Sequence, residues 1–402
     1  MTIGILTFYN YLNFGANLQG VSTYLYLKKH GHNPIFINYK SEENYEMWLS
    51  QMGNRQLQEH LRFVNGIIEN QTAFCHNQDQ LLAEIKKYKI EAIIVGSDAV
   101  LQHHPLISRI KIGKSLLPRC VNYLEEQMFP NLFWGIGFSE ILPCAMMSVS
   151  SQNSEYMHIG QSTKSKMAKA LLNFRYISVR DSWTHDMVKY IAGIETPVTP
   201  DPVFAFNVNA SEFVHDKEYI TEKHHLPDRY VLVSLKRQSL PVSVLDELKV
   251  LLKKQNVECV ALTMPNGVRF THHFNYSIEL PLSPDDWYSV IKNASAYVGS
   301  NMHPIVVSLH NAVPCVSIDN WGRTNIFGKK VNDGSSKVEH IMKEFGVEQN
   351  HRMINGNYCD IKASEIVSMI NEFPIPKVKE HAIELTCRYN QMMQDIINSF
   401  TL

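Results

Sequence analysis

One short segment has the residue types needed for proton transfer beside an anionic ligand. Residues 299–304 read GSNMHP and join an apolar run to a helical pattern. The spacing predicts that Ser300 caps the helix and that His303 lies in its first turn. A helix N-terminus favours a bound phosphate, and histidine exchanges protons near neutral pH. Because the chain has 18 histidines, a structural or surface role for His303 is the alternative.

The first loop of the chain suits an anionic or polyhydroxy ligand. Asn13, Gly15 and Asn17 lie between an apolar run and a helical pattern, where backbone N–H groups are exposed. The loop is neither a G-x-G-x-x-G dinucleotide motif nor a P-loop with its lysine. The alternative is a tight turn in which Asn17 caps the helix.

Ser97 and Asp98 follow a buried apolar run at 92–95. A carboxylate at the end of such a strand can hold a sugar hydroxyl or orient a catalytic group. The alternative is that Asp98 is a helix N-cap, which is a common role for an aspartate after a strand.

Arg180 directly follows the apolar run at 176–179 and precedes Asp181. At the end of a strand its guanidinium can clamp a carboxylate or a phosphate. A salt bridge to Asp181 or Asp186 is the alternative. Three further cations follow apolar runs in the second half of the chain and are either ligand-binding or solvated: Lys236, Arg237 and Arg323.

The sequence predicts no metal site. Two pairs of adjacent histidines, 103–104 and 272–273, lack carboxylate or cysteine neighbours at ligand spacing. The seven cysteines are scattered without a C-x-x-C pair, which fits a reducing compartment and neither a thiolate zinc site nor a disulfide framework. No G-x-S-x-G motif supports hydrolase chemistry.

Composition indicates a soluble globular protein. The 402 residues include 38 basic and 39 acidic ones, and this balance argues against a nucleic-acid-binding protein. The first basic residue is Lys28, so the charged start of a signal peptide is missing. The uncharged stretch 293–318 contains glycine, proline and histidine and is not expected to span a membrane. We expect a cytoplasmic protein.

Apolar runs and helical patterns alternate along the chain, which predicts parallel sheets with helical crossovers. Strands are predicted at 3–8, 35–39, 92–95, 132–136, 176–179, 197–199, 230–235, 258–263, 296–298 and 314–318. Helices are predicted at 18–30, 162–173, 181–192, 242–254, 285–293, 303–310 and 378–399, with two or three more between 41 and 89.

These elements predict an α/β fold of two Rossmann-like domains facing each other across a cleft. The N-terminal domain is expected over residues 1–205 and the C-terminal domain over 206–375. The remaining helix, 376–402, is expected to pack back on the N-terminal domain. Ligands in such sheets bind at the carboxyl ends of the strands, where all the candidates above lie.

The motifs, taken in order, resemble those of the polysaccharide pyruvyl transferase family over roughly residues 3–320. The segments that carry the resemblance are IGILTF at 3–8, NFGANLQ at 13–19, IIVGSD at 93–98, ISVRDS at 177–182, PDP at 200–202 and GSNMH at 299–303. The resemblance implies a fold like that of the two-domain GT-B glycosyltransferases. It also implies transfer of pyruvate from phosphoenolpyruvate onto two hydroxyls of a sugar, forming a ketal on a bacterial surface polysaccharide or its lipid-linked precursor.

The resemblance makes His303 the catalytic acid or base and Arg180 a donor-anion ligand, with phosphoenolpyruvate as donor substrate and no cofactor or metal. Asp98 is expected to assist catalysis. The other expected donor-binding residues are Ser300, Asn301, Lys236, Arg237 and Arg323, and the expected acceptor-binding residues are Asn13, Gly15, Asn17 and Ser97. The chain departs from many members at Asn301, where they have an arginine, and at Val100, where some have an aromatic residue.

Two other functions stay open. A glycosyltransferase that uses a nucleotide sugar is favoured by the uncharged Asn301, and a non-catalytic relative would bind a saccharide or a partner enzyme. The expected partners are phosphoenolpyruvate and a saccharide or lipid-linked saccharide, without nucleic acid. Because lipid-linked acceptors lie in the membrane, peripheral contact with its inner face is the most that we expect.

Overall fold

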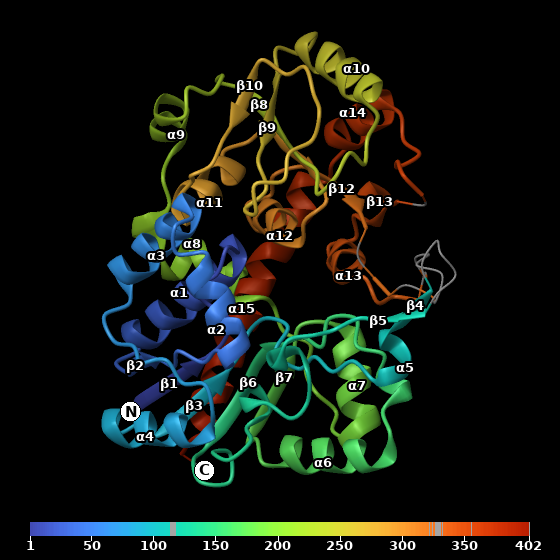
Figure 1. Cartoon of the computed structure of the whole chain (residues 1–402). Coiled ribbons are helices and arrows are strands. Elements are labelled where there is room, and N and C mark those ends of the chain that lie inside the picture. The colour runs from blue at the N-terminus through green and yellow to red at the C-terminus, as the bar shows by residue number, and fades with distance from the viewer. Residues whose placement is uncertain are drawn as a thin grey trace.

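The chain folds into two α/β lobes, one above the other in Figure 1. The computed structural model describes residues 1–112, 118–320, 322–323, 325, 331, 333–354 and 356–401. The lower lobe holds the first half of the chain, and the upper lobe holds most of the second half.

The N-terminal lobe is built on a sheet of five parallel strands in the order β2-β1-β3-β6-β7. Their bounds are β1 Thr2–Leu6, β2 Asn33–Phe36, β3 Ala92–Val95, β6 Cys144–Val149 and β7 Tyr176–Val179. The central strands β3 and β6 are buried along their whole length, as expected for a sheet with helices on both faces. The helices of this lobe are α1 Phe14–Lys29, α2 Glu42–Ser50, α3 Arg55–Ile67, α4 Gln78–Tyr88, α5 Leu106–Arg109, α6 Gln161–Leu172 and α7 Ser182–Ala192.

The C-terminal lobe has a sheet of six parallel strands in the order β10-β9-β8-β11-β12-β13. Their bounds are β8 Tyr230–Ser234, β9 Glu258–Leu262, β10 Tyr276–Ile278, β11 Ala296–Gly299, β12 Cys315–Asp319 and β13 His351–Met353. Its helices are α10 Val242–Lys253, α11 Pro284–Lys292, α12 Met302–His310, α13 Lys337–Glu344 and α14 Ala363–Asn371. The α/β class and the paired parallel sheets predicted from the sequence are therefore confirmed.

The chain passes between the lobes twice. The first connection contains α8 (Phe206–Asn209) and α9 (Lys217–Lys223), and the second is the long helix α15 (Ile375–Ser399). α15 lies beside α12 and then along β6 and β7 of the first sheet (Figure 1). Its end is held there because Arg175 Nη1 donates to the carbonyl oxygens of Ser399 at 3.2 Å and Phe400 at 3.1 Å.

One apolar core joins the two lobes. Phe14 at the start of α1 stacks on Trp287 of α11, with ring centroids 4.9 Å apart. Gln56 of α3 makes a reciprocal pair of bonds with Leu282, since its amide nitrogen donates to the carbonyl at 2.6 Å and its amide oxygen accepts from the backbone N–H at 2.7 Å. The buried cluster that contains Phe14 extends from β1 to α15, so these contacts fix how α1 faces α12.

The strand predicted at 132–136 is wrong. Residues Leu132–Trp134 form a short 3-10 helix that Asn131 caps by accepting from Phe133 N at 2.8 Å, and Gly135 ends it with φ +77°. A short buried apolar run does not distinguish strand from helix. The strand that the prediction missed is β6, whose sequence CAMMSV is poor in β-branched and aromatic residues.

Other elements differ less from those predicted from the sequence. The predicted strand at 197–199 is a single bridge between Val179 and Val198. The edge strands β10 and β13 were not predicted, since each has only three residues. A small antiparallel hairpin, β4 (Ile110–Ile112) with β5 (Pro118–Cys120), also adds to the N-terminal lobe.

Candidate functional site

Side chains from both lobes converge where the strands of the two sheets end. From the N-terminal lobe come Asp98 after β3, Arg180 after β7, and Asp201 beyond the bridge at Val198. From the C-terminal lobe come His303 in the first turn of α12 and Lys337 at the start of α13. Electrostatic coupling links His303 and Lys337 to Asp98, Arg180 and Asp201, which places all five in one charged cluster.

Arg180 is the centre of this cluster. Its Nη1 donates to Asp201 Oδ2 at 2.8 Å, and its Nη2 lies 3.6 Å from Asp98 Oδ1. The side chain is only 2% exposed, so these ion pairs are shielded from water. Its Nε and Nη2 atoms have no hydrogen-bond acceptor among the described residues. These two buried donors can therefore bind an oxyanion.

Asp98 stays ionised. Burial would raise the pKa of Asp98, but Arg180 and then His303 outweigh it and the pKa is lowered. Asp98 has φ +84°, a left-handed conformation rare outside glycine, and its carbonyl oxygen accepts from Ser150 N at 2.9 Å. No helix begins at this residue, so the alternative of an N-cap is wrong. Asp98 therefore offers a fixed carboxylate at the end of β3.

Asp201 connects Arg180 to His303 through Gln19. Its Oδ1 accepts from Val203 N at 2.9 Å, and its Oδ2 accepts from Gln19 Nε2 at 2.6 Å. The carboxylate fixes the amide of Gln19 with its nitrogen toward Asp201, since a flipped amide would place oxygen against oxygen. The second hydrogen of this nitrogen is then directed to His303 Nε2, at 3.4 Å.

His303 is neutral in the free protein. Burial lowers its pKa to about 4, and the attraction of Asp201 and Asp98 opposes this shift without cancelling it. With Nε2 facing the amide nitrogen of Gln19, the imidazole accepts at Nε2 and carries its proton on Nδ1. The ring also presses against Gly15 of α1, where a Cβ atom would overlap it.

The N-terminus of α12 lacks a side-chain cap among the described residues. The N-cap is Asn301, not Ser300 as the sequence predicted, and its amide nitrogen points to Met264 Sδ at 3.2 Å. Ser300 continues the pairing of β11 instead, since its N–H donates to Ser234 O at 3.1 Å. The first N–H groups of α12 therefore remain available to an anion beside His303.

Lys337 was missed by the sequence analysis. Burial and then Arg180 lower its pKa to about 8, while Asp98, Asp181 and Asp201 oppose the shift. Ser336 caps α13 by accepting from Glu339 N, and the S-x-x-E spacing is a recognisable helix-start signal that marks this position. Nothing in the sequence shows that this helix start faces Arg180.

Three predicted acceptor residues use their polar groups within the protein. Asn13, not Asn17, is the N-cap of α1 and accepts from Ala16 N at 3.3 Å. Asn17 accepts from Asn10 N at 2.9 Å, and Ser97 Oγ donates to Ser148 O at 2.6 Å. They shape the first loop and the end of β3, and Gly15 contacts His303 as described above.

Two of the three cations predicted after the second-lobe strands bind groups outside the charged cluster. Lys236 is exposed after β8, and Arg237 Nη2 donates to Gly356 O at 3.0 Å. Arg323 pairs with Asp333 at 2.8 Å and with Glu155 of the other lobe at 3.3 Å. Arg323 thus forms an ion pair between the two lobes.

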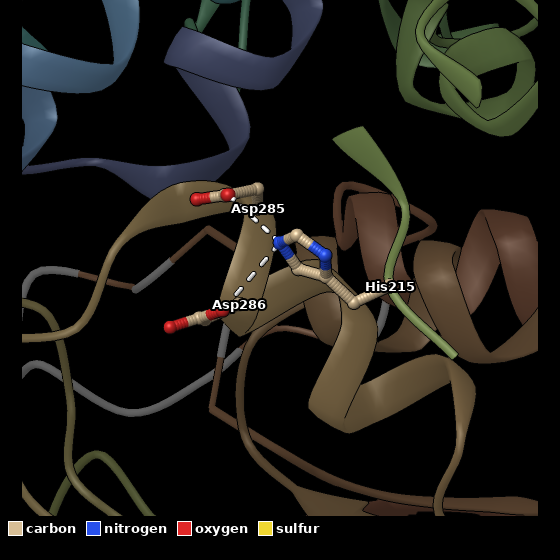
Figure 2. A group of neighbouring side chains, drawn as sticks. All are labelled: His215, Asp285 and Asp286. Atoms are coloured by element: carbon tan, nitrogen blue, oxygen red, sulfur yellow. Dashed lines mark hydrogen bonds and ion pairs between the residues drawn. The ribbon is translucent and has the colours of Figure 1, made fainter. Parts of the chain in front are cut away.

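A separate polar group in the second lobe has the residue types of a metal site. Figure 2 shows His215 directed at Asp285 and Asp286 of α11, with Nε2 to carboxylate distances of 3.0 Å and 3.7 Å. The other oxygen of Asp286 is already paired with Lys223 at 2.8 Å and His224 at 3.2 Å. The carboxylates thus belong to a network of contacts with Lys223 and the two histidines.

Solved structures of other proteins share the two-lobed fold of this chain. The UDP-GlcNAc 2-epimerase from Neisseria meningitidis bound to UDP-GlcNAc has a similar structure, with a TM-score of 0.59, 9% identity and 100% of both chains covered. The UDP-N-acetylglucosamine 2-epimerase from Rickettsia bellii has a TM-score of 0.51 and 10% identity, with 100% of this chain and 96% of that chain covered. No curated protein sequence matches significantly. At these identities the likeness concerns the fold, which is GT-B-like.

The protein is thus a two-domain α/β protein of the GT-B-like class, with a charged site between its lobes. Its sequence matches the family model for polysaccharide pyruvyl transferase over residues 13–322, well over half of the chain. The chain belongs to this family, which confirms the resemblance seen in the motifs.

The contact between Gly15 and His303 predicts a sharp steric effect. Gly15→Ala should destabilise the fold by about 1–3 kcal/mol in urea unfolding, because the new methyl overlaps the imidazole. Gly66→Ala in α3 is the control, since that position opens onto free space and alanine favours helix. Equal stability of the two variants would show that the lobes do not meet at His303.

The buried pairing of Arg180 predicts a second effect. Arg180→Ala should cost roughly 3–5 kcal/mol of unfolding free energy, because Asp201 and Asp98 would be left buried without their cation. Adding Asp201→Asn to this variant should restore part of the loss. Arg62→Ala, which removes an exposed pair with Glu59, should cost less than about 1 kcal/mol. A loss for Arg180→Ala no larger than for Arg62→Ala would refute this arrangement.

Proposed function

We propose that the protein transfers pyruvate from phosphoenolpyruvate to two hydroxyls of a sugar, forming a cyclic ketal on a surface polysaccharide or its lipid-linked precursor. The observation that carries the proposal is the placement of His303. A neutral imidazole lies at an uncapped helix N-terminus and is coupled to Arg180 and Lys337, which are both cations. Membership of the pyruvyl transferase family supports the same reaction.

The donor needs two anion-binding points, because phosphoenolpyruvate has a carboxylate and a phosphate. The first N–H groups of α12 supply one point, with the positive end of the helix dipole. Lys337 and the two buried donors of Arg180 supply the other. Lys337 thereby provides the positive charge that Asn301 lacks.

The reaction begins with a proton added to the methylene carbon of the donor. C2 becomes electrophilic, the first sugar hydroxyl forms a C–O bond to it, and that hydroxyl loses its proton. The bond from C2 to the phosphate oxygen then breaks, and the second hydroxyl attacks C2 and loses its proton. Two C–O bonds form, one breaks, and inorganic phosphate leaves with the remaining proton.

His303 is suited to carry these protons. Its pKa of about 4 in the free protein is too low for an acid at neutral pH, but a bound dianionic phosphate would raise it. The protonated ring then gives its proton to the methylene carbon and, once neutral, takes one from a sugar hydroxyl. Asp98, held ionised by Arg180, accepts a hydrogen bond from an acceptor hydroxyl.

A nucleotide sugar is the second candidate donor. The uncharged Asn301 favours it, and two structures of similar fold are epimerases of UDP-GlcNAc. The test therefore compares both donor classes directly.

Thermal unfolding of the purified protein with phosphoenolpyruvate or with UDP-, GDP- and CMP-linked sugars tests the proposal. Phosphoenolpyruvate at 100 times its Kd should add about 2.7 kcal/mol of stability. Lys337→Met should abolish most of this gain, whereas Lys343→Met on the exposed side of the same helix should preserve it. Stabilisation by one nucleotide sugar and not by phosphoenolpyruvate would overturn the proposal.

The pH dependence gives an independent check. Above about pH 8 the ammonium of Lys337 loses its proton in the free protein, so the affinity for phosphoenolpyruvate should fall as pH rises through this range. Lys337→Arg keeps its charge and should flatten the profile. An unchanged profile in Lys337→Arg would remove Lys337 from the donor site.

A further inference from the structure

Three aliphatic side chains lie exposed close together on one flank of the N-terminal lobe. Leu106 is 66% exposed, Ile107 is 60% exposed, and Ile110 is 40% exposed. The first two belong to the short helix α5, and Ile110 begins the hairpin strand β4. We call these three residues the α5 apolar patch. Neighbouring exposed aliphatic side chains mark a contact surface more often than isolated ones do.

The sequence around the patch is basic. Residues 99–124 contain four lysines and arginines and not one aspartate or glutamate, although the whole chain is balanced in charge. Arg109 ends α5. Lys111 of β4 lies opposite Arg119 of β5 in the strand register, and Arg119 is exposed. Cations therefore flank the apolar side chains. Long basic side chains beside an apolar patch suit an interface between water and anionic lipid.

The patch follows the candidate site along the chain and lies near a contact between the two lobes. Residues 99–104 lead directly from Asp98 in the charged cluster to α5. Lys111 Nζ lies 4.0 Å from Glu155, and Glu155 pairs with Arg323 of the C-terminal lobe at 3.3 Å. In Figure 1, β4 and β5 lie at the right, at the level where the two lobes meet, and α5 lies below them in the lower lobe. In the described chain, no helix has the length and apolar character of a membrane-spanning segment.

We propose that the α5 apolar patch docks the protein on an anionic lipid bilayer, with Leu106 and Ile107 entering the interface and the flanking cations meeting the headgroups. The inference extends the proposed function, since a lipid-linked acceptor would lie in the same bilayer beside the site. A second copy of the chain fits less well, because two basic flanks would face each other across a two-fold contact.

Vesicle co-sedimentation tests the docking without any turnover. The full chain should bind vesicles of phosphatidylglycerol and phosphatidylcholine, and bind vesicles of phosphatidylcholine alone much more weakly. Leu106→Ser with Ile107→Ser should weaken binding to the anionic vesicles by about tenfold or more. Leu172→Ser with Ile383→Ser is the matched control, because these side chains are 65% and 60% exposed elsewhere, and it should bind like the original chain.

Three outcomes would overturn the proposal. These are no binding to anionic vesicles, equal binding by the two double variants, and a concentration-dependent dimer that only Leu106→Ser with Ile107→Ser abolishes. The Leu106→Ser, Ile107→Ser variant should still be stabilised by phosphoenolpyruvate. Vesicle binding without that stabilisation would refute the proposed function and leave the docking intact.

Discussion

The close approach of His303 to Gly15 is the constraint on which the rest of the site depends. It joins the first turn of α12 in one lobe to the first turn of α1 in the other. Phe14, the neighbour of Gly15, stacks on Trp287, and Gln56 binds both backbone groups of Leu282. These contacts hold the two sheets with the carboxyl ends of their strands facing each other. A histidine of one lobe therefore lies near the carboxylates of the other.

The buried pairing of Arg180 gives this contact its chemistry. Arg180 keeps Asp98 ionised despite its burial and also pairs with Asp201. Asp201 in turn orients Gln19, whose amide faces His303. The amide thus holds the histidine as one tautomer, and burial keeps the ring neutral until an anion arrives. Burial and then the charge of Arg180 lower the pKa of Lys337, the cation that the second lobe brings to the same cluster.

Much of the fold could be predicted from the sequence, because buried parallel strands and amphipathic helices have distinct periods. The strands that carry Asp98 and Arg180 were placed residue for residue at 92–95 and 176–179, and His303 was placed in the first turn of a helix. The strands end at the same edge of the sheet, so these candidates could be grouped from the sequence. The roles of Gln19 and Lys337 could not be predicted, because they depend on how the helices of the two lobes face each other after packing. The strand error at 132–136 has the same origin, since only tertiary context distinguishes a buried turn of helix from a strand.

If His303 moves protons in pyruvyl transfer from phosphoenolpyruvate, its removal should stop turnover. The most direct measurement incubates the protein with phosphoenolpyruvate and lipid-linked saccharides from its source cells, and follows phosphate release together with the mass of the saccharide. We expect one pyruvyl group to be gained for each phosphate released, and both to be lost in a folded His303→Ala variant that still binds the donor. Full turnover by His303→Ala, or transfer of a sugar from a nucleotide sugar without pyruvyl gain, would contradict it.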